Sequence, residues 1–293
     1  MMTKETDKRG EILLEALPYI KKFWNKIVVI KYGGSAMQDK MLEGQIIEDI
    51  ILLKYVGMKP VIVHGGGAEI SQEMKKRNMV PQFIDGLRVT DQETMEITEM
   101  VLTGKVNTRL VAEINLHILE GKGNGVKGIG LSGEDAQLLT VKKHRIPELG
   151  LVGEVKKINP EILTILLEKN YIPVIATVGV DKKGVRYNIN ADTVAGQIAI
   201  SLQAEKLIYL SDVDGIFKDF KDPTSVISSL TINQAKDLIE SGQIQKGMIP
   251  KVDSAVQALE GGVNKVHFLN GKRAHSILLE LFTDSGIGTE IVP

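Results

Sequence analysis

Five short β-branched runs, each flanked by glycine or followed by a helical pattern, restrict the fold of this sequence more than any other feature. Each run is continuously apolar rather than alternating, which is typical of strands buried on both faces of a parallel sheet. Such strands, alternating with helices, predict an α/β protein with helices covering both faces of the sheet. The predicted strands are residues 26–31, 60–64, 172–177, 206–210 and 265–269.

Helical patterns separate these strands and would supply the two outer layers. The candidate crossover helices are residues 44–55, 68–77, 92–119, 192–203, 231–240, 251–260 and 272–282. Residues 121–155 break the pattern with glycine-interrupted short runs, which we interpret as β-hairpins added to the α/β core. The strand–helix alternation restarts near residues 178–184. We therefore expect two lobes, residues 26–180 and residues 181–293, preceded by an N-terminal helix within residues 1–25.

The N-terminal helix is predicted over residues 6–24, where apolar side chains recur at three-to-four spacing. It precedes the first strand and is not needed to begin an α/β sheet. Two interpretations stay open: the helix packs on its own lobe, or it forms an arm that docks on another subunit.

The charge balance and the absence of cysteine exclude several classes of function. The chain has 36 Lys and Arg against 37 Asp and Glu, so no basic excess predicts a nucleic-acid or membrane-surface partner. With no cysteine, disulfides, thiolate metal sites and thiol nucleophiles are excluded. The polar N-terminus lacks the apolar segment of a signal peptide, and no apolar run reaches the roughly 20 residues that span a bilayer. We expect a cytoplasmic protein.

Three glycine-containing clusters each come just after the end of a predicted strand. They are Gly33-Gly34, Gly65-Gly66-Gly67 and the turn from Ser211 to Gly215. At the carboxyl end of a parallel strand, a glycine turn lets the backbone approach a ligand, and the next helix offers free N–H groups to an anion. Tight strand-to-helix turns also need glycine, so one such loop is weak support. Two of them within the first 70 residues favour an anion site.

The best-known nucleotide motifs do not occur in the sequence. There is no G-x-x-x-x-G-K-[ST] segment, which excludes a Walker-type NTPase, and no H-R-D or D-F-G, which excludes a protein kinase. The G-x-G-x-x-G fingerprint does not follow the first strand, which disfavours a dinucleotide oxidoreductase. HExxH and paired Cys/His spacings are missing as well. A phosphate-handling protein of this sequence therefore needs a different scheme.

Two lysines stand where a phosphate could be held. Lys31 ends an apolar strand directly before the glycine pair, so its side chain would reach the ligand crevice as a point charge for phosphoryl oxygens. Lys251 begins a predicted helix, where a cation opposes the helix dipole unless an anion compensates. The alternative for Lys31 is a strand-end lysine that only extends its amine to solvent.

Three further polar residues complete this set. Asp192 begins the helix over residues 192–203 and could simply be its N-cap. Asn188 lies just before it and would face inward as a donor. Arg88, in Gly86-Leu87-Arg88-Val89-Thr90, can bind a carboxylate through two parallel hydrogen bonds, or it is an ordinary surface arginine. Together these residues would bind phosphate and carboxylate without a nucleophile or a metal cage.

Six segments, in this order, resemble those of the amino acid kinase superfamily, and most closely its N-acetylglutamate kinase branch. They are KYGGS, VIVHGGG, GLRVT, NINAD, LSDVDGI and GMIPK, spread over residues 26–292. The resemblance implies an open three-layer α/β/α sandwich with a mainly parallel central sheet. It implies that residues 26–180 bind N-acetyl-L-glutamate and residues 181–293 bind ATP with Mg²⁺. The implied reaction is phosphorylation of the side-chain carboxylate, a step of arginine biosynthesis.

The resemblance also implies roles for individual residues. Lys31 and Lys251 would be the transition-state lysines, with Asp192 positioning them. The acceptor would be bound by Gly66, Gly67, Arg88 and Asn188. The nucleotide would lie along Gly33, Gly34, Ser211, Asp212, Asp214, Gly215, Gly247 and Met248. No protein side chain would hold the Mg²⁺, which the nucleotide phosphates would carry. One departure is Lys246, because the family usually has a second glycine there.

The chemistry of the acceptor agrees with this scheme. A side-chain carboxylate has a pKa of about 4 and is already ionised at neutral pH, so no general base is needed. Asp192 should therefore orient the lysines rather than abstract a proton. The main difficulty is repulsion between an anionic acceptor and a polyanionic nucleotide, which the lysines, the glycine N–H groups and Mg²⁺ all reduce.

Arginine regulation is a further implication of the resemblance. The N-terminal helix and residues 267–291 resemble those of arginine-inhibited members, in which the helix interlaces dimers into a hexameric ring. By matching, arginine would contact Lys218, His267, Glu280 and Gly286. Glu280 could bind a guanidinium or an α-ammonium group. The alternatives are a core histidine at position 267 and a solvated helix face at Glu280.

Three rival functions stay open from the sequence. The first is another kinase of the same superfamily, acting on glutamate, aspartate, carbamate or a carrier-bound aminoadipate. The second is a non-catalytic arginine-sensing or partner-binding protein on the same fold, which would not need Lys31, Asp192 and Lys251 together. The third is a dinucleotide oxidoreductase, disfavoured by the missing fingerprint.

Overall fold

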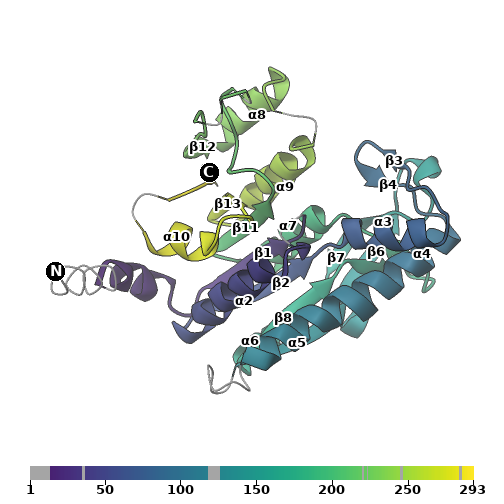
Figure 1. The fold of residues 1–293 in the computed structure, drawn as a ribbon, viewed down its shortest axis with the longest axis horizontal. Helices are drawn as coiled ribbons and strands as arrows, with labels where there is room; N and C mark the ends of the chain where they lie inside the picture. Colours follow the sequence, from purple (N-terminus) through teal and green to yellow (C-terminus); the bar gives the residue numbers. More distant parts are fainter. Residues whose placement is uncertain are drawn as a thin grey trace.

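An eight-stranded sheet forms the centre of the molecule in the computed structural model, which describes residues 14–34, 37–117, 126–219, 221–222, 224–244, 247–283 and 286–293 (Figure 1). Its order is β12-β14-β13-β11-β1-β2-β8-β5, and neighbouring strands are parallel except for the antiparallel pair β13 and β14. The strands are β1 (Ile27–Tyr32), β2 (Lys59–His64), β5 (Lys127–Ser132), β8 (Tyr171–Ala176), β11 (Lys206–Ser211), β12 (Ser229–Thr231), β13 (Lys265–Asn270) and β14 (Thr289–Val292).

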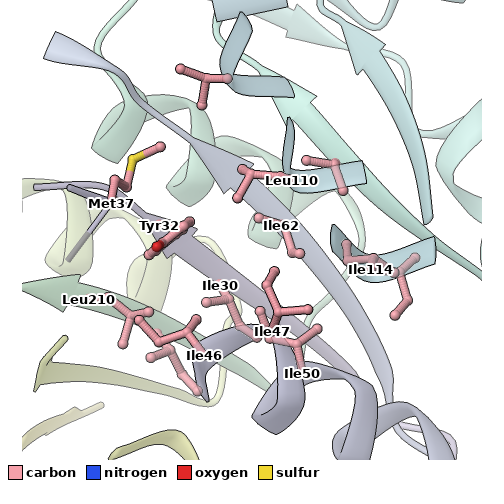
Figure 2. Packing of buried hydrophobic residues seen from close by; sticks show 14 of the residues in the cluster. Ile30, Tyr32, Met37, Ile46, Ile47, Ile50, Ile62, Leu110, Ile114 and Leu210 are labelled. Carbon is pink, nitrogen blue, oxygen red and sulfur yellow. The ribbon is translucent and has the colours of Figure 1, made fainter. Parts of the chain in front are cut away.

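Helices cover both faces of this sheet, so the fold is the predicted three-layer α/β/α sandwich. The first layer holds α2 (Lys40–Tyr55), α3 (Gly67–Lys76), α4 (Gln92–Glu99), the π-helix η2 (Met100–Asn107), α5 (Thr108–His117) and α10 (Ser276–Phe282). The second layer holds α6 (Glu161–Glu168), α7 (Ala191–Ser201), α8 (Ile232–Glu240) and α9 (Ile249–Glu260). Each layer has its own apolar core against the sheet, and Figure 2 shows the first core around Ile30, Ile47 and Ile62.

The central strand β1 sends alternate side chains to the two cores. Ile30 and Tyr32 are fully buried in the first core, and Val29 is fully buried in the second. Because strand side chains alternate, Lys31 lies on the same side as Val29, the side covered by α7. The alternation of one strand thus places a lysine beneath the helix that carries Asp192.

Smaller sheets lie beside the main one. A four-stranded sheet has the order β10-β9-β6-β7, and a hairpin pairs β3 with β4. The strands are β3 (Phe83–Ile84), β4 (Leu87–Arg88), β6 (Leu139–Lys143), β7 (Gly153–Ile158), β9 (Val178–Val180) and β10 (Arg186–Asn188), with short 3₁₀ turns at η4 (Asp135–Gln137) and η5 (Pro147–Leu149). The hairpins predicted over residues 121–155 are therefore only partly correct. β6 and β7 do pair antiparallel, but β5 joins the main sheet parallel to β8.

The five predicted strands are confirmed, each within one residue of its predicted ends. The helix predicted over residues 92–119 is one run of α4, η2 and α5 as far as residue 117, and the next residues lie outside those described. Helix α6 and strands β12 and β14 were not predicted. The division into lobes at residues 180 and 181 stays a prediction; strands β9 and β10 of one small sheet lie on either side of it.

Residues 14–23 of the predicted N-terminal helix are helical, and residues 6–13 lie outside the described part. Phe23 is buried in the first core, and Trp24 covers Gly57 so closely that a Cβ there would lie 2.2 Å from the indole. Leu14 and Trp24, however, are 69% and 63% exposed. The helix therefore packs on its own chain and also presents apolar side chains outward. Among the described helices, none is both long and apolar enough to cross a membrane.

Candidate active site

Asp192 lies between the two predicted catalytic lysines. Its Oδ1 is 3.1 Å from Lys31 Nζ, and its Oδ2 is 2.5 Å from Lys251 Nζ. The three side chains come from the carboxyl end of β1 and the first turns of α7 and α9. The side chain of Asp192 is only 8% exposed. Segments far apart in the sequence thus meet in one buried ion triad.

Asn190, not Asp192, caps helix α7. The Asn190 Oδ1 atom accepts hydrogen bonds from the backbone N–H groups of Asp192 at 2.8 Å and Thr193 at 3.1 Å. The alternative in which Asp192 is an ordinary N-cap is therefore wrong. Because Asn190 satisfies those donors, the carboxylate of Asp192 is available to the two lysines.

The triad shifts the pKa values of its members. Burial by itself would raise the pKa of Asp192, but the charges of Lys31 and Lys251 outweigh it and hold that pKa below the usual range. Burial lowers the pKa of Lys31; the attraction of Asp192 offsets this only in part, and the nearby charge of Lys251 adds to the lowering. Two lysines with one carboxylate leave an excess of positive charge, which suits a polyanionic ligand.

A cavity of about 210 Å³ opens beside this triad. It brings together Lys31, Asp192 and all four predicted acceptor-binding residues, Gly66, Gly67, Arg88 and Asn188. The two glycine loops meet there, Gly33-Gly34 after β1 and Gly65–Gly67 after β2. A Cβ on Gly33 would lie 2.9 Å from Lys31 Nζ, so a larger residue at 33 would displace the lysine.

Arg88 is a buried cavity residue rather than a surface arginine. Its Nη2 donates to Gly67 O at 2.7 Å and to Ser71 Oγ at 2.8 Å, and its guanidinium lies 4.8 Å from the centre of the Phe83 ring. Asn188 lies nearby and donates from Nδ2 to Thr90 Oγ1 at 3.2 Å. A fixed guanidinium and an amide donor on one wall can hold a carboxylate.

Helix N-termini add to the positive character of the site. Helix α3 begins at Gly67 and α9 at Ile249, and neither has a side-chain cap on its first turn. The N–H groups of these first turns and the helix dipoles favour a bound anion. A Cβ on Gly66 would lie 2.7 Å from Leu102 Cδ2, which explains glycine at that position.

Apart from Gly33 and Gly34, the residues predicted along the nucleotide belong to the end of β11, to the turn after it or to the residues just before α9. The Asp212 carboxylate would be 3.0 Å from a Cβ on Gly34, whose φ of +82° also favours glycine. Asp214 accepts a hydrogen bond from Asn270 Nδ2 at 2.9 Å. Gly215 and Met248 line one small, mainly apolar cavity with Val213, Ile216, Phe217, Gln243 and Ile244. Ser211 ends β11 and donates from its hydroxyl to Val213 O, and Gly247 precedes α9. Lys246 lies outside the described residues.

The residues predicted to contact a bound arginine do not all lie in one cavity. His267, Glu280 and Gly286 line a second cavity of about 440 Å³, whereas the exposed Lys218 is not among its described lining residues. His267 Nδ1 lies 2.7 Å from Glu280 Oε1 and its Nε2 lies 2.9 Å from Lys206 Nζ. The other Glu280 oxygen accepts from the backbone N–H of Ile287 at 2.7 Å. The cavity thus holds both a carboxylate and a lysine at its wall.

Several residues that position the site were missed from the sequence. The Asn190 cap could have been found, since Asn followed by a helical pattern is an N-terminal signal. Lys206, which lines the second cavity and whose pKa burial lowers to about 8, begins an apolar strand and belongs to no motif that would mark it in the sequence. Tyr209 and Ser254, which both hydrogen-bond to Asp192 O, depend on contacts distant in sequence. Within the described residues, no group of three His, Cys, Asp or Glu side chains is placed to hold a metal ion.

The chain resembles known proteins over nearly its whole length. The profile of the amino acid kinase family matches residues 26–270. The acetylglutamate kinase of Halothermothrix orenii is 50% identical over 293 residues, covering 99% of both chains. That of Methanocaldococcus jannaschii is 49% identical over 298 residues, covering 98% of this chain and 97% of the relative.

Solved structures give the same fold. The N-acetylglutamate synthase of Neisseria gonorrhoeae, complexed with coenzyme A and N-acetyl-glutamate, superposes with a TM-score of 0.83 at 28% identity. The match covers 97% of this chain but only 63% of the synthase. The synthase complexed with coenzyme A and L-arginine gives a TM-score of 0.81 at 27% identity, covering 97% of this chain and 65% of that one. Since the profile covers most of the chain and relatives near half identity cover almost all of it, the chain belongs to the amino acid kinase family, as its motifs predict.

Proposed function

We propose that this chain transfers the γ-phosphoryl group of ATP to the side-chain carboxylate of N-acetyl-L-glutamate. The products are N-acetyl-L-glutamyl 5-phosphate and ADP. The observation that carries the proposal is the Lys31–Asp192–Lys251 triad at the edge of a cavity that also holds Arg88. Relatives of about half identity named as acetylglutamate kinases support the choice of acceptor.

The acceptor binds in the cavity of Gly66, Gly67, Arg88 and Asn188. Arg88 pairs with the α-carboxylate, because its guanidinium is already fixed by Gly67 O and Ser71 Oγ and needs little further ordering. The side-chain carboxylate then points toward the triad as the nucleophile. It is ionised at neutral pH, so the chain needs no base to activate it.

The two lysines act on the transferring phosphoryl group. Its equatorial oxygens carry the charge of the transition state, and Lys31 on β1 and Lys251 on α9 approach from different elements to balance it. Asp192 keeps both amines in place and stays ionised, because its pKa is held low. Its role is positioning, with no proton transferred.

The nucleotide lies along Ser211, Asp212, Asp214, Gly215, Gly247 and Met248, with Gly33 and Gly34 beneath its phosphates. A Mg²⁺ ion would be carried by the ATP phosphates themselves. Such an ion would neutralise part of the phosphate charge. Within this segment, the carboxylate of Asp212 lies close to the glycine loop at Gly34.

Arginine inhibition and a ring-shaped assembly are part of this proposal. The cavity with His267, Glu280 and Gly286 has the carboxylate that a guanidinium needs, and the related synthase is known in complex with L-arginine. The exposed Leu14 and Trp24 of the N-terminal helix fit an interface between dimers in a homo-hexamer. The cytoplasm is the expected location.

A coupled assay of ADP release tests the proposed function. We expect ATP-dependent turnover with N-acetyl-L-glutamate, and little with L-glutamate, aspartate or carbamate. L-glutamate and aspartate carry a free α-ammonium group that does not fit beside Arg88, and carbamate lacks the α-carboxylate that Arg88 would bind. Arginine added to the same assay should inhibit. Equal or better turnover with any of the other acceptors would overturn the assignment of the substrate.

A further inference from the structure

The loop Gly65–Gly67 follows a histidine that the proposed mechanism does not use. His64 ends β2 and is fully buried. Its Nδ1 lies 2.9 Å from the carbonyl oxygen of Gly65, and its Nε2 lies 3.0 Å from Asn107 Nδ2. The imidazole thus bridges the acceptor-binding loop and the last residue of the π-helix η2.

Asn107 has only one chemically consistent orientation. Its amide nitrogen also lies 2.9 Å from the carbonyl oxygen of Val174 in β8, and a carbonyl can only accept. The NH₂ group must therefore face Val174 O, and its second hydrogen points at His64 Nε2. Gly130 makes room for the other side of the amide, since a Cβ there would lie 2.0 Å from Asn107 Oδ1.

The orientation of Asn107 fixes the protonation of His64. Because Nε2 receives a hydrogen from Asn107, it must carry a lone pair, and the single ring proton lies on Nδ1. Nδ1–H then donates to Gly65 O. Burial, together with the charge of Arg109, lowers the pKa of His64 to about 4, although the hydrogen bond to Gly65 O acts in the opposite direction. A protonated ring would turn an N–H toward the NH₂ of Asn107, so the geometry and the burial agree.

The hydrogen bond to Gly65 O orients the next peptide. The C=O of Gly65 and the N–H of Gly66 belong to one planar trans unit and point in opposite directions. Holding that carbonyl toward the imidazole therefore turns the N–H of Gly66 away from it. Gly66 lines the acceptor cavity and directly precedes helix α3, whose first turn has no side-chain cap. Segments of π-helix are rare and recur at functional sites, which fits the place of Asn107 at the end of one.

We infer that His64 and Asn107 are positioning residues: the neutral Nδ1–H form of His64, fixed by Asn107, holds the Gly65–Gly67 loop in the conformation that binds the acceptor. The inference rests on the proposed function for the identity of the acceptor. The tautomer itself does not depend on that function, so the two can fail separately.

Nitrogen NMR of the ¹⁵N-labelled full chain tests the tautomer without any substrate. The His64 signals are assigned by their loss in the His64→Asn variant. We expect a pyridine-type Nε2, a pyrrole-type Nδ1 and no titration of this ring between about pH 5.5 and 8. A proton on Nε2, or a ring that titrates in that range, would overturn the inference.

Steady-state kinetics test the effect on the loop. Asn107→Leu should raise KM for N-acetyl-L-glutamate about tenfold or more, because the loop loses its fixed orientation, while KM for ATP changes by less than about twofold. His64→Leu should act in the same direction. His64→Asn should recover much of the acceptor affinity, because its amide can donate to Gly65 O from nearly the position of Nδ1.

Asn115→Leu is the matched control. Asn115 lies on α5 and exchanges two hydrogen bonds with the backbone of Gly128 in β5, but it does not line the acceptor cavity. It should lose stability with both KM values close to the wild type. Equal effects of Asn107→Leu and Asn115→Leu on the acceptor KM would reduce Asn107 to a structural residue and overturn the inference. A wild type inactive on N-acetyl-L-glutamate would contradict the proposed function, with the tautomer still measurable.

Discussion

Gly196 of α7 and Ser254 of α9 approach so closely that a Cβ on Gly196 would lie 2.8 Å from Ser254 Oγ. The Ser254 hydroxyl also donates to the carbonyl oxygen of Asp192 at 3.0 Å and lies 2.8 Å from Tyr209 Oη. Asp192 is four residues before Gly196, and Lys251 is three residues before Ser254. This contact therefore sets the distance between the helices that carry Asp192 and Lys251.

Gly196→Ala should weaken catalysis by moving α9 away from α7. The added methyl group must displace Ser254, and a shift toward 1 Å at a catalytic pair costs up to about 100-fold in rate. We expect kcat to fall by about 10-fold or more and stability to fall by about 1–3 kcal/mol. The measurement is steady-state kinetics with thermal denaturation of the same preparations.

Gly44→Ala provides the matched control for that substitution. Gly44 lies in α2, and a Cβ there would meet nothing within 4 Å. The helix should gain about 0.5–1 kcal/mol of stability, with unchanged kcat. If Gly196→Ala keeps the wild-type kcat, the spacing of α7 and α9 does not limit the reaction.

Lys31→Arg should lower kcat far more than it raises KM for either substrate. The guanidinium keeps the charge, but it is planar and longer than an ammonium group, and it cannot keep the 3.1 Å contact with Asp192 in the same place beside Gly33. We expect a loss of about 100-fold or more in kcat. Lys251→Arg should behave similarly. An unchanged kcat in both variants would remove these lysines from the mechanism.

How much of this site could be predicted from the sequence depended on how far apart in the sequence the contacting residues lie. The strands were predicted well because buried parallel strands are short, continuous apolar runs, and the ends of such strands meet at one sheet edge. Lys31 lies at the end of one such strand and Gly66 lies just after the end of another, so this rule by itself places them at the same edge. The ion triad was expected only through the family resemblance.

Other features leave no trace in local patterns. Strand β5 looked like part of a hairpin because of its glycines, yet Gly130 makes room for Asn107 and Gly128 packs against Ile114. Both positions thus hold glycine because of packing against residues distant in the sequence, but in the sequence alone such glycines look like those of a turn. The contact between Gly196 and Ser254 likewise produces no periodic pattern in either helix.

The pH dependence of kcat/KM should show an alkaline limb and no acid limb from the triad. Lys31 must be charged to act, and burial holds its pKa below the usual 10.5, so its charge is lost at a lower pH than that of an exposed lysine. Asp192 has its pKa below 3.8 and stays ionised down to about pH 5. Its contribution to stability is likewise present above pH 3.8 and is lost only as the pH falls through its lowered pKa.

Lys31→Arg identifies the group behind the alkaline limb. A guanidinium stays charged throughout the accessible range, so the residual kcat/KM of the variant should lack the limb. Profiles from about pH 6 to 10 for both proteins, each normalised to its own maximum, make the comparison. A limb that persists unchanged in the variant would belong to another group.

Glu280→Gln should weaken inhibition by arginine. In the wild type, Glu280 accepts hydrogen bonds from His267 Nδ1 and from the backbone N–H of Ile287 and lines the second cavity. A neutral amide cannot form an ion pair with a guanidinium, and its NH₂ group would face one of these donors. We expect the arginine concentration for half inhibition to rise by about 10-fold or more, from the loss of a charged hydrogen bond.

The matched control for this substitution is Glu260→Gln, on the exposed end of α9. Glu260 pairs with Lys236 at 2.7 Å, is about half exposed and does not line the second cavity among its described residues. Inhibition is measured relative to the uninhibited rate of each variant, which separates regulation from catalysis. The Glu260→Gln curve should match that of the wild type. A Glu280→Gln curve equal to it would place the arginine site elsewhere, and a wild-type curve flat to millimolar arginine would reject the regulation altogether.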